Sequence, residues 1–492
     1  MSAHGAGSTG RNRHLLAALV CALAHTPSAT AGLNDLQGQF SNDVEESSAL
    51  ANQATYDALL VNNGGNCLAA QRAPTAQCGG AEFELFTGTR SLVQTANEIA
   101  GEGPIEFSLG LDLSGLGEAL RWRAGEEFAG QGSLTTEFVN GQLSGLASRV
   151  SALRFGATGF ALQGFDISTG ELAQQPGAPH LRHALGASGD DENYGGWSGF
   201  LNGSYGYGDK DATGNENAFD FEGYEVSAGL DYRLNDQWVV GGVLGYVERE
   251  VDFQQIDSFV VDGGVETDGY SIAPFVLYQA GDYFATASVG YQEVSFETNR
   301  FIKYPSLNPD VFGTNSRSVS DTDSATLSVF VSGGYTFYFG GFIVEPFVSV
   351  NYLDITVDAF SEQDLFGEST DLRVEEQEFE SLEGSLGAKF IYAFSTEWGV
   401  ITPYVDVEWR LQFEDDSRII EASYNEVAGI ADDASVKFQV ETDELDDEYF
   451  TISLGAAMAF AQGWQGFVSY RTIEDQENYS HEVISAGVRY EF

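Results

Sequence analysis

The sequence predicts a mainly β protein, in which an antiparallel transmembrane β-barrel of about twelve strands follows a small helical N-terminal domain. Three observations predict it. The chain ends on an alternating segment whose last residue is aromatic, long alternating segments recur after residue 194, and the residues before 165 follow a helical period. Mean hydropathy is -0.16 and no apolar run of spanning length follows the N-terminal leader, which excludes a helical membrane protein. A barrel remains possible, because its strands distribute their lipid-facing residues in alternation.

The C-terminal segment 479–492 carries the strongest signal. One face of this segment is apolar and holds Ile484, Ala486, Val488, Tyr490 and Phe492. Bacterial outer-membrane barrels usually end this way, because the assembly machinery reads the last strand. We therefore interpret Val488, Tyr490 and Phe492 as an assembly signal. The alternative is the edge strand of a soluble sandwich.

The segment 401–414 shows the clearest strand alternation. Its apolar face carries Val405 and Val407, and its polar face carries Asp406, Glu408 and Arg410. An apolar face next to a charged face over this length favours lipid outside and water inside, so we expect Asp406, Glu408 and Arg410 to face the lumen.

Twelve such strands can be placed in residues 194–492, an even number, as single-chain bacterial barrels require. Short turns alternate with longer connections, of which 298–321, 358–375 and 415–447 are the longest. Outer-membrane barrels have short turns in the periplasm and long loops outside, which predicts a periplasmic C-terminus.

The N-terminus predicts export. Arg11, Arg13 and His14 precede an apolar stretch that is too short to span a bilayer, and small residues follow. We interpret residues 1–31 as a signal peptide that is cleaved between Ala31 and Gly32. Cys67 and Cys78 remain after cleavage, and in the oxidising periplasm we expect a disulfide, with a metal site as the poorer alternative.

Residues 32–165 are expected to form a helical passenger or N-terminal domain, with Leu143, Leu146, Val150 and Leu153 on one stripe of a helix. Residues 166–193 are rich in Gly, Pro and polar side chains and are expected to form a linker. We expect this linker to lie in the barrel lumen, with the segment His180–His183 attracted by acidic lumen residues.

The arrangement of residues 190–492 resembles the autotransporter, or type V secretion, family. The resemblance rests on the segments VEPFVSVNY at 344–352 and ITPYVDVEW at 401–409, on Trp197 to Tyr207, and on the terminal Phe492. It implies an outer-membrane translocator of a Gram-negative bacterium that exports or anchors the upstream passenger at the cell surface. The implied partners are outer-membrane lipid, the barrel-assembly machinery and periplasmic chaperones, with an unidentified surface ligand as a further possibility. The alternative function is a structural or adhesive barrel, or a plugged pore, with a periplasmic helical domain.

Catalytic chemistry is not expected. The sequence has no G-x-S-x-G or GDSL motif for a serine hydrolase and no H-E-x-x-H zinc helix. The chain has 22 Lys and Arg against 74 Asp and Glu, a net charge of -52, which excludes nucleic acid as a partner. Acidic runs such as 441–448 lack the spacing of an EF-hand and are read as hydrated loop rims rather than cation sites. We therefore expect no enzyme activity, no cofactor and no metal.

Overall fold

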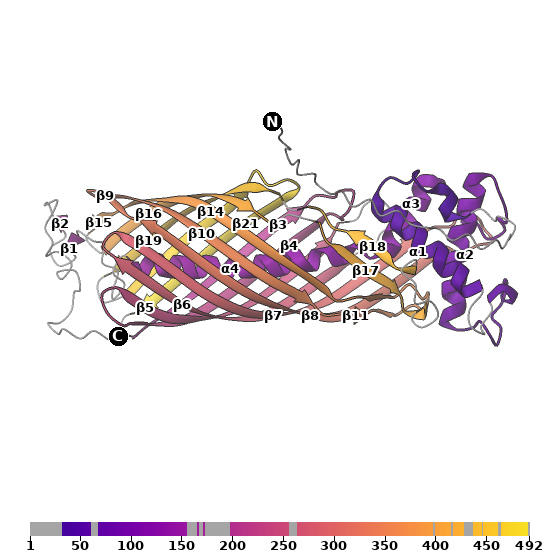
Figure 1. Cartoon of the computed structure of the whole chain (residues 1–492), viewed down its shortest axis with the longest axis horizontal. Coiled ribbons are helices and arrows are strands. Elements are labelled where there is room, and N and C mark those ends of the chain that lie inside the picture. Colours follow the sequence, from indigo (N-terminus) through magenta and orange to yellow (C-terminus); the bar gives the residue numbers. More distant parts are fainter. Residues whose placement is uncertain are drawn as a thin grey trace, which may run out of the picture.

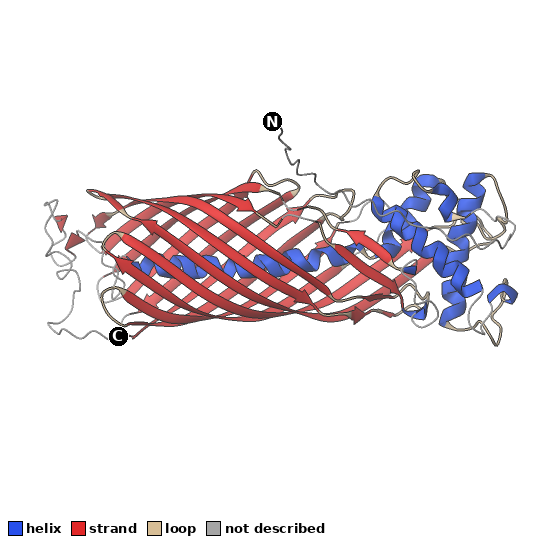
Figure 2. Ribbon diagram, viewed as in Figure 1, coloured by secondary structure: helices blue, strands red, loops and turns tan. Residues whose placement is uncertain are grey.

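The computed structural model shows an elongated molecule, with a long barrel and a helical domain at one end of it (Figure 1; Figure 2). It describes residues 32–60, 67–154, 165–166, 171–172, 197–254, 263–396, 399–414, 417–427, 436–444, 446–460 and 464–490. None of the described helices is long and apolar enough to cross a membrane.

Twelve antiparallel strands form a closed barrel within the described part of the chain, which confirms the predicted fold class. The ring closes because the last strand pairs with the first, with Tyr479 opposite Lys210, and β10 pairs with β8. The barrel strands are β3 (Trp197–Lys210), β4 (Phe219–Arg233), β5 (Trp238–Phe253), β6 (Gly264–Ala280), β7 (Tyr283–Tyr304), β8 (Thr314–Tyr335), β10 (Phe342–Val357), β14 (Gln377–Tyr392), β16 (Gly399–Gln412), β19 (Glu448–Phe460), β20 (Trp464–Glu474) and β21 (Tyr479–Tyr490). Short strands β9 (Phe337–Phe339) and β15 (Phe394–Thr396) extend β10 and β16 pairing.

Side chains alternate between the two faces of each strand. In β6, Thr267, Ser271 and Phe275 are buried in the barrel, whereas Tyr270 and Ile272 are exposed on its outer face. Because the period of a strand is two residues, one sequence can present lipid-compatible residues outward and a different set inward. The strands therefore form without any continuous apolar run.

The two ends of the barrel differ in their connections. At one end, which we call the turn end, the connections are short: 234–237, 281–282 and 340–341. At the other, the loop end, the segments 305–313, 358–376 and 413–447 are longer. In outer-membrane barrels the end with short turns faces the periplasm and the end with long loops faces outside. Tyr490, the last described residue, lies at the turn end opposite Trp464.

A second sheet stands at the loop end. It has four strands in the order β11 (Phe360–Ser361), β13 (Leu372–Val374), β17 (Ile419–Tyr424) and β18 (Phe438–Glu441). These strands belong to the two longest connections, and β12 (Gln363–Asp364) joins the first of them to β8. Strand pairing thus holds the described parts of these two loops in place.

The N-terminal residues 32–129 fold into a helical domain at the loop end, which we call the cap. It contains η1 (Leu33–Leu36), α1 (Asp43–Leu60), η2 (Cys67–Ala69), α2 (Ala81–Ala100), α3 (Leu113–Ala124) and η3 (Glu126–Ala129). Local signals define these helices: the Asp112 carboxylate accepts a hydrogen bond from the Gly115 amide at the start of α3, and Gly101 and Gly125 end α2 and α3 in the left-handed region. A disulfide joins Cys67 to Cys78.

The cap and the loop end of the barrel share two hydrophobic cores. In the first, Ala51 and Phe86 of the cap pack with Leu372, Tyr424 and other residues of the four-stranded loop sheet. In the second, α2 and α3 pack with Ile302 and Tyr304, which lie at the loop end of β7. The cap is therefore not a separate globule, because neither core is complete without residues from the barrel.

The structure differs from the expected domain organisation in one helix. Helix α4 (Gly130–Arg154), expected to belong to the N-terminal domain, lies inside the barrel (Figure 2). The expected lumen segment 166–193 falls almost entirely outside the described residues, as does the segment His180–His183. Three residues of the predicted stripe, Leu143, Leu146 and Val150, pack on an apolar wall of the lumen.

Candidate functional site in the barrel lumen

Helix α4 lies along one side of the lumen. Near the loop end, Leu134 and Phe138 pack with Phe219, Val251 and Phe253. Farther along the helix, a second cluster holds the stripe residues and surrounds them with inward side chains of β3, β5, β6, β7 and β10: Val139, Leu143, Leu146, Val150, Phe200, Val239, Val243, Phe275, Leu277, Phe284, Leu353 and Ile355. The helix therefore runs from the loop end towards the turn end, and its 25 residues span about 37 Å.

Small and polar groups fix the helix against this wall. A Cβ at Gly141 would overlap the carboxylate of Glu225 on β4, so glycine permits the close approach at this position. The Gln142 amide donates a hydrogen bond to the Ser271 hydroxyl on β6, and the Gln292 amide on β7 donates to the Thr135 carbonyl at 3.1 Å. Hydrogen bonds of this kind specify one rotation of the helix, whereas the apolar contacts alone would tolerate several.

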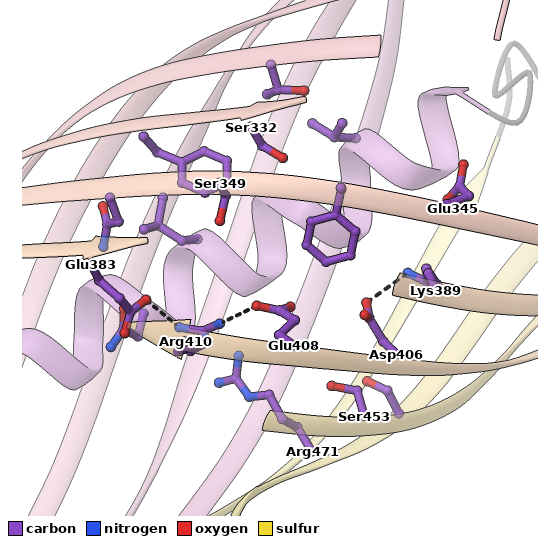
Figure 3. A pocket seen from close by; sticks show the side chains of 18 of the residues that line it. Ser332, Glu345, Ser349, Glu383, Lys389, Asp406, Glu408, Arg410, Ser453 and Arg471 are labelled. Atoms are coloured by element: carbon purple, nitrogen blue, oxygen red, sulfur yellow. Dashed lines mark hydrogen bonds and ion pairs between the residues drawn. The ribbon is translucent and has the colours of Figure 1, made fainter. Parts of the chain in front are cut away.

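The opposite side of the lumen is polar and contains a cavity (Figure 3). Its empty space, including the part open to solvent, is about 1190 Å³. Asn140, Leu143 and Val150 of α4 line one side, and inward residues of the barrel line the other. The barrel residues are Phe284, Thr286, Phe330, Ser332, Glu345, Phe347, Ser349, Asn351, Glu383, Lys389, Tyr404, Asp406, Glu408, Arg410, Ser453, Ser469, Arg471 and Ser485.

Five of the charged residues that line the cavity contact a residue of opposite charge. Arg410 donates hydrogen bonds to Glu383 at 2.8 Å and to Glu408 at 3.0 Å, and its neighbour Tyr449 donates to Glu383 at 2.5 Å. Lys389 lies 4.0 Å from Asp406, directly across the β14–β16 ladder, and 4.3 Å from the centroid of the Tyr404 ring. Pairing offsets the cost of removing these charges from bulk water.

The cavity lining offers polar groups that can bind water. Its residues include hydroxyl groups, ion pairs and aromatic rings, but no histidine or cysteine among those described. A serine nucleophile needs a general base within hydrogen-bond reach, and the histidine that usually supplies it is not among these lining residues.

Comparison with known proteins identifies the family to which the barrel belongs. The family model described as "Autotransporter beta-domain" matches residues 199–471, which is more than half of the chain. The chain belongs to the autotransporter β-domain family. The barrel is accordingly an autotransporter translocator in the outer membrane of a Gram-negative bacterium, as the sequence predicted.

Individual relatives are distant. The chain is similar to the esterase EstA of Pseudomonas aeruginosa and to that of Pseudomonas putida, each 24% identical over 296 residues, which are 59% of this chain and 42% of the relative. The autotransporter thus spans less than half the length of these curated relatives. Among solved structures it is similar to the translocator domain of NalP from Neisseria meningitidis, with 15% identity, 60% of this chain and 89% of that chain covered, and a TM-score of 0.45. The β domain of the Bordetella autotransporter BrkA gives 17% identity, 61% and 100% coverage, and a TM-score of 0.42.

The predicted site residues lie in three places of the autotransporter. Asp406, Glu408 and Arg410 line the lumen cavity, and Val405 and Val407, which alternate with them along the strand, are exposed on the outer face. Cys67 and Cys78 are bonded to each other in the cap, so their sulfurs are not available as metal ligands. Gly32 is the first described residue and donates its amide to Asp35 at 2.8 Å, while Ala31 lies outside the described residues.

The expected assembly signal is described only in part. Val488 is exposed on the outer face of β21, Tyr490 is the last residue of that strand, and Phe492 lies outside the described residues.

Sequence reasoning missed the partners of the predicted lumen residues. Lys389, Glu383 and Arg471 complete the charged lining, and none was singled out. For Lys389 the signal was present, because a short turn between β14 and β16 fixes the hairpin register and brings Lys389 opposite Asp406. Nothing comparable pointed to α4, since its apolar stripe is equally suited to packing against helices.

Proposed function

We propose that this autotransporter displays its own cap at the cell surface and keeps it there, as a fixed helical domain on the extracellular end of the barrel. The observation that carries the proposal is the shared core: buried residues of the cap and of the four-stranded loop sheet form one cluster. A passenger that is to be released needs an interface that can separate in water. A continuous apolar core favours permanent attachment, because separation would expose it.

A buried polar network supports fixed attachment. Arg123 of α3 is excluded from solvent and donates hydrogen bonds to the Tyr304 hydroxyl at 2.8 Å and to the Tyr424 hydroxyl at 2.9 Å. The Tyr424 hydroxyl in turn donates to Asn52 of α1 at 2.9 Å. The network thus alternates between cap and barrel, and separation would leave its buried polar groups without partners, which costs more than the bonds themselves contribute.

Helix α4 supplies a second attachment. It follows η3 of the cap without a break and then lies in the lumen, so the cap is tethered through the barrel as well as docked on its rim. The tether and the dock act together, because a tethered domain rebinds its site at a high effective concentration.

Display rather than hydrolysis is the function that we propose. The name "esterase" belongs to relatives of which the chain spans 42% of the length, and that activity is not carried over to this chain. The cap has neither of the two serine-hydrolase motifs sought in the sequence.

Surface labelling tests the proposal. Ile105→Cys places a thiol on an exposed loop of the cap, and Phe312→Cys places one on the barrel loop between β7 and β8, where the native side chain is 97% exposed. Because the native cysteines are bonded to each other, each variant carries one reactive thiol. We expect a membrane-impermeant maleimide to label both variants equally on intact cells, with no cap in the culture medium.

Asp236→Cys, in the short turn between β4 and β5, is the matched control. It should react only after the outer membrane is permeabilised. If Ile105→Cys behaves like Asp236→Cys, the helical domain is periplasmic and the alternative function is correct. Cap recovered from the medium would show release and overturn fixed display.

A further inference from the structure

We propose that the chain's own acidic residues 32–129 pass along the polar side of the lumen during export, and that Lys389, Arg410 and Arg471 keep this wall close to neutral so that it does not repel them. The inference rests on the proposed function, since it concerns how the displayed cap reaches the surface.

The first observation is that α4 leaves one side of the lumen unfilled. The cavity beside α4 is lined by β7, β8, β10, β14, β16, β19, β20 and β21. A smaller recess on the β3–β4 side of the helix shares Arg471 and Ser485 with it, so the two spaces adjoin. Charged and hydroxyl groups line the unfilled space together with aromatic rings, whereas the wall against which α4 packs is mainly apolar. An unfolded chain exposes its polar backbone, which is compatible with the polar side.

The second observation is the charge of the segment that must pass. Residues 32–129 contain 14 acidic and 4 basic side chains, a net charge of -10. The acidic residues run from Asp35 to Glu127 with one gap, between Asp57 and Glu82, so that most stretches inside the lumen carry negative charge.

The third observation is the charge of the wall. Four acidic residues line the cavity, Glu345, Glu383, Asp406 and Glu408, and by themselves they would repel a passing carboxylate. Charges interact more strongly in a narrow lumen with low-dielectric walls than at an open surface. Three basic residues offset all but one of these charges: Arg410 contacts Glu383 and Glu408, Lys389 lies opposite Asp406, and Arg471 is directed into the same space (Figure 3).

The wall is also able to exchange contacts with a moving chain. One oxygen of Asp406 and the Nε of Arg410 have no hydrogen-bond partner, and five serines line the cavity. Such groups offer weak, interchangeable hydrogen bonds to backbone amides and carbonyls, which keep a chain solvated without holding it at one register.

The experiment removes the positive charge of Lys389 either alone or together with the negative charge of Asp406. Lys389→Gln leaves Asp406 without its cation and makes the wall more acidic by one charge. The double variant Lys389→Gln/Asp406→Asn lacks the same ion pair but keeps the wild-type wall charge. Export is measured in the full chain that carries Ile105→Cys, as the rate at which newly made protein becomes labelled on intact cells. The rate is divided by the amount of folded barrel, which is recognised because heating changes its mobility on a gel. We expect Lys389→Gln to slow export several-fold and the double variant to restore a rate close to wild type.

A second arm changes the passing chain. Asp43→Asn, Glu84→Gln and Glu102→Gln together remove three negative charges from exposed positions of the cap. They should relieve most of the defect of Lys389→Gln while changing wild-type export little. Arg471→Gln, made in parallel, should slow export in the same way, and neutralising the cap should again restore the rate. This second variant keeps the test decisive if Lys389→Gln lowers barrel assembly.

Equal rates for Lys389→Gln and the double variant would overturn the proposal, as would a defect that neutralising the cap does not change. These outcomes leave surface display intact. Absence of surface label in the parent Ile105→Cys chain would instead overturn the proposed function, so the two failures are distinguishable.

Discussion

Arg300 and Glu362 form a two-pronged ion pair inside the loop end of the barrel, where both side chains are excluded from solvent. The Nε of Arg300 donates to one carboxylate oxygen at 2.9 Å and its Nη2 donates to the other at 2.6 Å. The third nitrogen, Nη1, donates to the Trp122 carbonyl in the cap at 2.9 Å. The Arg300 side chain thus joins strand β7 to the loop that carries Glu362 and to the cap.

Removing one partner of this pair should weaken cap docking strongly. Arg300→Ala leaves Glu362 charged and buried, and such a change typically costs about 3–5 kcal/mol. Pulse proteolysis of the purified chain across a urea series would measure the loss as earlier cleavage of the cap. The apolar double variant Arg300→Met/Glu362→Leu should lose clearly less, and equal losses for the two variants would show that the pair itself is unimportant.

Cap stability should fall as the pH rises from about 4.5 to above 7. Burial raises the pKa of Glu127 from 4.5 to about 7, against the opposing attraction of Arg300, and its Oε2 has no hydrogen-bond partner. The folded state therefore holds a proton that the unfolded chain releases, so its stability is greatest below the unfolded pKa and is lost as pH rises through the folded one.

Glu127→Gln tests this dependence because it removes the titration and keeps the shape. At pH 8 it should stabilise the cap by up to about 3 kcal/mol, and at pH 4.5 by little. Urea midpoints of cap cleavage at the two pH values are the measurement. A stabilisation independent of pH would contradict the assignment to Glu127.

The apolar wall, rather than the polar cavity, should hold α4 in place. Leu146→Ala removes a buried side chain from the cluster with the β5 and β6 residues and should cost about 2–5 kcal/mol of local stability. Hydrogen exchange of the α4 amides should accelerate accordingly. Asn140→Ala, on the cavity side of the same helix, is the control and should change exchange little.

The lipid face should not tolerate charge at mid-strand. Val405 is exposed on the outer face of β16, and Arg at the midplane of a barrel costs about 2–4 kcal/mol. Val405→Arg should reduce heat-modifiable folded barrel in membranes, whereas Val405→Leu and the lumen substitution Asp406→Asn should not. Comparable losses from Val405→Arg and Asp406→Asn would reverse the assignment of the two faces.

Strand parity was predictable because it depends on adjacent residues alone. Val405 and Asp406 must face opposite ways in any strand, and only one of them is compatible with lipid. The number of strands was predictable as well, because each alternating segment in the sequence is bounded by its own turn.

What lies far apart in the sequence was not predictable. The pairing of Arg300 with Glu362 depends on β12 joining β8, and Arg123 meets Tyr424 across 301 residues. The position of α4 depends on inward residues such as Val239 and Phe275, which form an apolar wall only after the barrel closes. Val239 and Val240 are neighbours of the same residue type, so the sequence does not indicate that the inward one will receive a helix.

Strands β7 and β8 each run for 22 residues, where a tilted strand needs about 9–11 to cross the hydrocarbon layer. The additional residues of these two strands extend the loop end of the barrel beyond the bilayer, so that the cap rests on a rigid β-sheet extension. Its height is set by ladder hydrogen bonds and not by a flexible stalk, so the cap stands at one distance and one tilt from the membrane plane. If the cap is displayed as proposed above, a molecule arriving from outside meets the same face of it on every copy.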